Sequence, residues 1–181
     1  MTTPVFATTK SLTIRAFRDS DLDPLVAIIA SHDVQRTGPR TVLPKWNKTV
    51  DGVKTATSNA TFFAVVEYEG QPIGQVELWG GQDKNRDASF GIVLGDGHRD
   101  KGFGTEVTRY VVDYAFMQLG LHRVSLGMMG DNPRAYALYK KTGFVEEGRK
   151  RKAVWQDGAW VDMIDMGILY EDWAAARKVT Q

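Results

Sequence analysis

The stretch from His98 to Glu106, HRDKGFGTE, has the composition of a phosphate-binding turn. Gly102 and Gly104 carry no Cβ, so the backbone there can approach a diphosphate closely and turn through angles that side chains disfavour. Arg99 and Lys101 add positive charge beside the same turn. The first N–H groups of a helix lack intrahelical partners, and the helix dipole makes that end positive, so anions bind there. The sequence predicts an anion site if a helix begins at this turn.

The flanking residues place the turn between a strand and a helix. Before it, Phe90, Ile92 and Leu94 alternate with other residues as in a strand. After it, apolar residues recur at helical spacing to about Leu119. The sequence here contains neither GxxxxGK followed by Ser or Thr nor a three-glycine GxGxxG. A nucleoside-triphosphate P-loop and a dinucleotide fingerprint are therefore not indicated.

A second segment, Asn132 to Phe144 (NPRAYALYKKTGF), predicts a short helix. Asn132 is a favourable N-cap, Pro133 suits the first helical position, and Gly143 suits the residue beyond the helix end. Helical spacing puts Tyr139 on the apolar stripe, facing the interior. Periodicity alone favours a core aromatic at this position.

Together the two segments resemble the acyl-CoA motifs of the GNAT N-acetyltransferase superfamily. RDKGFG fits the Arg/Gln-x-x-Gly-x-Gly/Ala signature for the diphosphate of acetyl-CoA. NPRAYALYKKTGF is similar to Asn-x-x-Ala-x-x-x-Tyr-x-Lys-x-Gly-Phe, whose tyrosine commonly protonates the departing CoA thiolate. The wider string from Leu119 to Gly148 most resembles the group of ribosomal-protein N-terminal acetyltransferases and spermidine acetyltransferases.

The expected fold class is α+β. The resemblance implies the GNAT fold, a mixed, mostly antiparallel central sheet flanked by helices and splayed at the acetyl-CoA-binding strand. We expect residues 1–181 to form one domain with its core at about 12–169. The residue patterns predict strands at 12–17, 62–68, 73–79, 88–94, 123–129, 145–154 and 160–169, and helices at about 21–30, 47–58, 133–142 and 170–177, with a further helix from the phosphate turn to about 119. A loop is expected from Ser31 to Trp46, which contains Gly38, Pro39 and Pro44.

Composition narrows the classes of partner. A net charge of +1 argues against a general nucleic-acid-binding surface. The chain has no cysteine, and His98 and His122 are too isolated to indicate a metal site. No segment approaches the roughly 20 apolar residues of a membrane span, and Met1 to Lys10 lacks the apolar run of a signal peptide. We expect a cytoplasmic protein without metal, nucleic-acid or membrane partners.

The resemblance implies that a primary amine attacks the thioester of acetyl-CoA directly, in a ternary complex. It implies that Tyr139 is the acid, that the backbone of Ile92, Val93 and Leu94 pairs with the pantetheine arm, and that Asn132 anchors that arm. The full set of implied cofactor-binding residues is Ile92, Val93, Leu94, Arg99, Asp100, Lys101, Gly102, Phe103, Gly104, Thr105, Asn132 and Lys141.

The general base has three candidates. Glu77 is the first choice, because Gln75, Glu77 and Trp79 share one face of a strand beside the expected cleft, although a solvated carboxylate fits the same pattern. Asp162 is second, since burial on its strand could raise its affinity for a proton. A water relay is the third.

The acceptor is the least defined part of the prediction. Asp33 and Asp51 are the only acids from Ser31 to Ser58, so we favour a peptide N-terminus or a small uncharged amine. A polyamine acetyltransferase and a noncatalytic acyl-CoA-binding regulator are the alternatives. A homodimer could form through an apolar strand edge or helix face.

Overall fold

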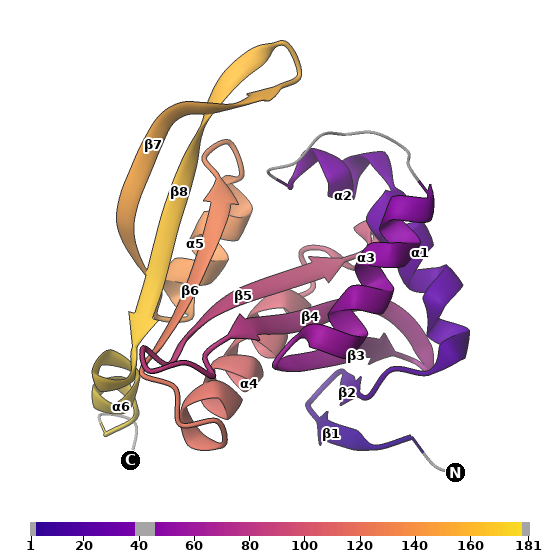
Figure 1. The fold of residues 1–181 in the computed structure, drawn as a ribbon, viewed down its shortest axis with the longest axis horizontal. Coiled ribbons are helices and arrows are strands. Elements are labelled where there is room, and N and C mark those ends of the chain that lie inside the picture. The colour runs from indigo at the N-terminus through magenta and orange to yellow at the C-terminus, as the bar shows by residue number, and fades with distance from the viewer. Residues whose placement is uncertain (1–2, 39–45, 179–181) are drawn as a thin grey trace.

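A computed structural model describes residues 3–38 and 46–178, and within them a sheet of eight strands runs through the molecule (Figure 1). The strands are β1 (Val5–Thr8), β2 (Thr13–Arg15), β3 (Phe62–Tyr68), β4 (Gln71–Gly80), β5 (Asp87–Leu94), β6 (Arg123–Met129), β7 (Val145–Gln156) and β8 (Ala159–Leu169). The helices are η1 (Asp19–Asp21), α1 (Leu22–Ala30), α2 (His32–Arg36), α3 (Trp46–Asn59), η2 (Asp96–His98), α4 (Phe103–Met117), α5 (Pro133–Lys141) and α6 (Tyr170–Lys178).

The sheet is antiparallel except at its centre. Its order is β1-β2-β3-β4-β5-β6-β8-β7, and β5 pairs with β6 in parallel. That pairing is confined to Asp87–Ser89 of β5 and Arg123–Ser125 of β6. Beyond Ser89 the two strands separate, as Figure 1 shows. The predicted fold class, a mostly antiparallel sheet splayed at one strand, is confirmed.

Two cores cover opposite faces of this sheet. Neighbouring strand residues point to opposite sides, so Val76 and Leu78 of β4 face α4, where they pack with Val107 and Val111. On the other face, Val65 packs with residues of α1 and α3 in a smaller cluster. Gln75 and Glu77 alternate with Val76 and Leu78, and they therefore lie on the α1 and α3 side.

The predicted loop from Ser31 to Trp46 is wrong in its first part, which forms α2. Ser31 caps this helix by accepting a hydrogen bond from the Val34 N–H at 3.4 Å. Five residues are too few for helical periodicity to be recognised in a sequence. The remainder of the predicted loop, residues 39–45, lies outside the described residues, and α3 already begins at Trp46.

Strand β1 was not predicted, because its residues are mostly exposed and show no alternation of buried and exposed side chains. The short helix η2 was not predicted either, and the remaining differences are shifts of strand and helix ends. Strand β4 begins at Gln71 rather than Ile73, because Glu69 and Gly70 form the whole turn, both with positive φ. At the other hairpin, Asp157 and Gly158 form a similar turn with positive φ.

The hairpin of β7 and β8 projects beyond the rest of the sheet, and its turn reaches toward α2 (Figure 1). Asp157 in this turn pairs with Arg36 of α2, with 2.7 Å between Oδ2 and Nε. Gln156, which is buried, donates to Asp131 after β6 at 3.0 Å. The hairpin and α2 therefore flank the same end of the gap between β5 and β6.

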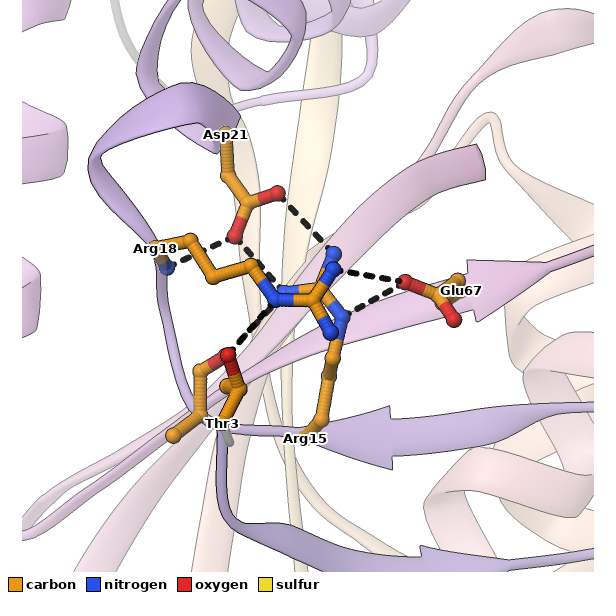
Figure 2. A network of polar contacts seen from close by, with 6 residues as sticks. Thr3, Arg15, Arg18, Asp21 and Glu67 are labelled. Atoms are coloured by element: carbon orange, nitrogen blue, oxygen red, sulfur yellow. Dashed lines mark hydrogen bonds and ion pairs between the residues drawn. The ribbon is translucent and has the colours of Figure 1, made fainter. Parts of the chain in front are cut away.

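A buried ion network joins β2, β3 and the start of α1 (Figure 2). Arg15 donates through both terminal nitrogens to the Asp21 carboxylate, at 2.7 and 2.9 Å, and through Nε to Glu67 at 2.6 Å. Arg15 and Asp21 are 1% and 4% exposed. The Arg18 N–H also donates to Asp21 at 2.7 Å. The network fixes the residues that lead into α1, the helix over the Gln75 and Glu77 face.

Candidate active site

A cavity of about 510 Å³ opens where β5 leaves β6. It is lined by β4, β5, the turn into α4, β6, α5 and α2. The lining residues are Val34, Thr37, Gly38, Gln75, Glu77, Phe90, Gly91, Ile92, Val93, Leu94, His98, Arg99, Asp100, Gly102, Phe103, Gly104, Thr105, Gly127, Met128, Asn132, Arg134, Ala135, Ala137, Leu138, Tyr139 and Lys141. Two segments from different parts of the sequence, 90–105 and 132–141, supply most of the wall.

Glu77 lies against the backbone of β5. Its partner across the strands is Gly91, and a Cβ at Gly91 would lie only 3.1 Å from Glu77 Oε1. The absence of a side chain at Gly91 therefore allows the carboxylate to rest on this strand. Burial raises the pKa of Glu77, and hydrogen bonds from Trp79 and Gln75 partly oppose that shift. A carboxylate with a raised pKa beside a cleft has the properties of a general base.

Tyr139 reaches the cavity from α5. Its ring packs edge-on against Phe90, with 6.3 Å between centroids, and against Phe144 at 5.7 Å. Burial raises the pKa of Tyr139 to about 12, so the hydroxyl keeps its proton at neutral pH. Within residues 3–38 and 46–178 the hydroxyl has no hydrogen-bond partner, so its proton is free to be given to a ligand.

Glu77 and Tyr139 approach β5 from opposite faces of the sheet. Phe90, the contact of Tyr139, belongs to the core on the α4 side. Gly91, the contact of Glu77, is its neighbour in the strand and so faces the α1 side. A group held along β5 in the gap would have a carboxylate on one side and a phenol on the other.

The turn into α4 has the geometry expected of an anion site. Gly102 is the N-cap with φ of 82°, a conformation that favours glycine. A Cβ at Gly104 would lie 2.7 Å from Cδ1 of Leu138, so glycine also lets α4 approach α5. The charged side chains here are partly paired: Arg99 contacts Asp96 at 2.5 Å, and Asp100 contacts Arg134 at 3.1 Å.

Asn132 and Lys141 lie at the two ends of α5, and both line the cavity. The Asn132 side-chain oxygen accepts from the Ala135 N–H at 3.0 Å, which confirms its role as the helix cap. This bond uses the oxygen and leaves the Nδ2 donors for other partners. The predicted anchoring of a pantetheine arm by Asn132 and the predicted phosphate contact of Lys141 stay predictions.

Of the residues predicted to form the site, Lys101 is the one whose side chain does not line the cavity. Its ammonium lies 5.7 Å from the centre of the Tyr68 ring. Asp162, the second candidate base, also lies outside the lining. The expectation that burial raises its proton affinity is wrong: a hydrogen bond from the Lys152 N–H lowers the pKa of Asp162, and one from Arg149 adds to this.

Several lining residues have no predicted role. Val34 and Thr37 lie on or just after α2, where the sequence predicts a loop. Arg134 stands inside the second motif, next to the expected cofactor residues, and its charge could have drawn attention to it. Gln75 was placed on the correct face of its strand without a function of its own.

Among the residues that the structure describes, no group of three or more His, Cys, Asp or Glu side chains is placed to hold a metal ion. In the same part of the chain, none of the helices has the length and apolar character needed to cross a bilayer.

Residues 11–145 match the family model of the acetyltransferase (GNAT) domain. The spermidine N(1)-acetyltransferase of Vibrio cholerae is 36% identical over 107 residues, 59% of this chain and 62% of that protein. The putative ribosomal N-acetyltransferase YdaF of Bacillus subtilis is 25% identical, with 92% of this chain and 95% of that protein covered. In the solved structure of a spermidine N-acetyltransferase from Vibrio cholerae with CoA and spermine, 99% of that chain superimposes on 92% of this one, with a TM-score of 0.81 and 28% identity.

With its cleft between two separating strands, the fold is that of the GNAT class of acyltransferases. The chain belongs to the acetyltransferase (GNAT) family, whose members use acetyl-CoA as cosubstrate. The family predicted from the two motifs is therefore confirmed. The match with the Vibrio cholerae relative spans less than two thirds of that protein's length, at 62%.

Proposed function

We propose that this protein transfers the acetyl group of acetyl-CoA to a primary amine by direct attack in a ternary complex. The observation that carries the proposal is the placement of Glu77 and Tyr139 on opposite sides of β5 within one cavity. A thioester held along β5 would meet the amine on the Glu77 side and lose its thiolate on the Tyr139 side. The two proton transfers that the reaction requires would then be carried out by separate groups.

The chain also offers a place for the rest of the cosubstrate. Within the described part of the chain, the backbone groups of Ile92, Val93 and Leu94 that point toward β6 have no strand partner, because the pairing of β5 and β6 stops at Ser89. An extended pantetheine arm can pair with them as a further strand would. The N–H groups at the start of α4, next to Gly102 and Gly104, can then hold the diphosphate.

For the acceptor we propose a peptide α-amine or a small monoamine. Bases outnumber acids in the sequence from Ser31 to Ser58, which includes α2: Arg36, Arg40, Lys45, Lys48 and Lys54 against Asp33 and Asp51. Burying the several ammonium groups of a polyamine requires matching carboxylates. Glu77 and Asp100 are the acids that line the cavity within the described residues, and Asp100 is paired with Arg134. The similarity to spermidine acetyltransferases makes polyamines the second candidate.

The test is acceptor-dependent release of CoA thiol across short peptides, spermidine, spermine and small monoamines, with the product confirmed by mass. The chain has no cysteine, so it adds no thiol background. We expect turnover of peptides or monoamines to exceed that of polyamines. Turnover of polyamines alone would overturn the acceptor proposal, and binding of acetyl-CoA without turnover of any amine would favour a noncatalytic regulator.

The proposed base makes a prediction about pH. Burial raises the pKa of Glu77 above its ordinary value. At saturating substrates, kcat should therefore fall as pH drops through this raised pKa and the carboxylate gains a proton. Glu77→Gln should lower kcat by about 10² near neutral pH, the usual scale of general-base catalysis, and should remove this acid limb. For an α-amine acceptor, with a pKa of about 7.7–8.0, the deficit should narrow as pH rises and the amine loses its proton unaided.

The matched control is Glu69→Gln in the exposed turn after β3, which should leave kcat and its pH profile unchanged. An acid limb that persists in Glu77→Gln would exclude Glu77 as the base and would favour the water relay.

We make three wider proposals. Residues 1–181 form one N-acetyltransferase domain. The protein acts in the cytoplasm, where acetyl-CoA is available to it, and cell fractionation tests this.

The protein forms a homodimer through the β7 edge of the sheet, near the exposed Val145, Trp155 and Trp160 side chains. Light scattering that gives the mass of one chain would contradict the dimer.

A further inference from the structure

Gln75 carries a hydrogen-bonding atom that no described residue uses. Gln75 is 6% exposed and lines the same cavity as Glu77 and Tyr139. The amide nitrogen donates to Glu77 Oε2 at 3.3 Å, whereas the amide oxygen is closed to solvent and has no partner within residues 3–38 and 46–178. A buried acceptor without a donor is unfavourable, and such atoms are few in folded proteins.

The surroundings of Gln75 explain why its oxygen is unpaired. An ionised carboxylate can only accept, so the amide nitrogen must face Glu77 and the oxygen must point elsewhere. The neighbours of Gln75 on the same face are Val65 of β3 and Val93 of β5, neither of which offers a side-chain donor. The terminal torsion of glutamine is soft, so a small rotation can present the oxygen to a donor that enters the cavity.

We propose that Gln75 and Glu77 together hold the two N–H groups of a primary amine, and that Gln75 thereby selects primary over secondary amines. The inference rests on the proposed acetyl transfer. In that reaction the amine nitrogen forms a bond to the carbonyl carbon, the carbon–sulfur bond breaks, and the sulfur receives a proton from Tyr139. One amine proton passes to Glu77. The other remains on the product amide, and Gln75 Oε1 accepts the hydrogen bond from it throughout.

The number of N–H groups decides the selectivity. A neutral primary amine has one proton for Glu77 and one hydrogen-bond donor for Gln75. A neutral secondary amine has a single N–H, which the reaction must remove, so Gln75 gains nothing from it. The discrimination then comes from a hydrogen bond made only with the correct substrate, which is an effective way to reject an analogue.

The test is a thermodynamic cycle that combines one substitution in the protein with methylation of the acceptor nitrogen. Gln75→Met keeps the length of the side chain and removes both polar atoms. The matched acceptors are a tripeptide amide headed by alanine and the same peptide headed by N-methylalanine, with spermidine and its N1,N8-dimethyl derivative as a second pair. Comparing how methylation changes kcat/KM in wild type and in Gln75→Met separates the effect of the hydrogen bond from that of the bulk of the methyl group.

We expect Gln75→Met to lower kcat/KM for the primary amines by about tenfold, as the loss of a buried hydrogen bond implies, and to change it for the secondary amines by less than about twofold. The KM for acetyl-CoA should not change. The melting temperature should change little, because the variant removes an unpaired buried acceptor together with the donor to Glu77. Gln71→Met, an exposed position on the same strand and outside the cavity, is the matched control and should behave as wild type.

If Gln75→Met lowers kcat/KM equally for primary and secondary amines, or clearly lowers the melting temperature, the proposal is overturned and Gln75 is a structural residue. The same cycle is measured by calorimetry as binding of the four amines to the CoA-loaded protein. Absence of any turnover in wild type would contradict the proposed function. In that case a primary-amine preference in binding that Gln75→Met abolishes still supports Gln75 as the recognition residue, and its absence overturns that role.

Discussion

Tyr139→Phe is expected to lower kcat by about 10² while leaving acetyl-CoA binding unchanged, if Tyr139 is the acid that protonates the leaving thiolate. The variant removes one oxygen and keeps the ring that packs against Phe90 and Phe144. A thiolate whose conjugate thiol has a pKa of about 8.5 is a fairly good leaving group even without protonation. The expected loss of kcat therefore lies at the lower end of the range for general acids. Steady-state rates together with calorimetric binding of acetyl-CoA separate the two effects.

The pH profile adds a second readout. Because burial raises the pKa of Tyr139 to about 12, the wild-type rate should show no alkaline decline from this group below about pH 11. Tyr136→Phe is the control, since Tyr136 lies on the same helix but outside the cavity lining. Unchanged turnover in Tyr139→Phe would exclude the tyrosine as acid. Loss of acetyl-CoA binding would instead show that the hydroxyl holds the cosubstrate.

The local geometry of the candidate site could be predicted from neighbouring residues. The turn at Gly102 needs a positive φ and an adjacent helix start, and both requirements are visible in neighbouring residues. The Asn132 cap and the inward position of Tyr139 depend on spacing within one short helix. The separation of β5 from β6 was implied by family resemblance rather than by any residue pattern.

The parts that were missed depend on contacts between distant segments. Lys101 lies outside the cavity lining, with its ammonium over the Tyr68 ring of β3. The pKa of Asp162 is lowered because Lys152, where β7 bulges and φ is 51°, turns its N–H toward the carboxylate. The unpaired oxygen of Gln75 results from the register of three strands. None of these contacts leaves a signal at the residue's own place in the sequence.

The largest effect on stability is expected at the buried ion network of Figure 2. Arg15→Met leaves the Asp21 carboxylate, 4% exposed, without its cation. Removing one member of a buried ion pair typically costs about 3–5 kcal/mol. Urea unfolding near neutral pH should show a loss of this size. Arg18→Met is the control, since Arg18 is 44% exposed and its side chain lies at the rim of the network, so its loss should stay below about 1 kcal/mol.

The dependence of this loss on pH separates charge from packing. Burial by itself raises the pKa of Asp21, but the hydrogen bonds from Arg15 and from the Arg18 N–H more than offset it, so the net pKa is lowered. In wild type the contribution of Asp21 is therefore present above the unfolded pKa and is lost as pH falls through the lower folded pKa. In Arg15→Met burial, which has the largest influence, remains together with the Arg18 N–H and the Arg18 charge, and the pKa of Asp21 should rise above its unfolded value. Stability of the variant should then improve as pH falls through that raised pKa, the opposite of the wild-type trend for this group.

Arg15→Met combined with Asp21→Asn should recover part of the loss near neutral pH, since no unpaired charge is left at Asp21. A loss that is equal at all pH values and persists in the double variant would show that Arg15 stabilises α1 by filling space rather than by its charge.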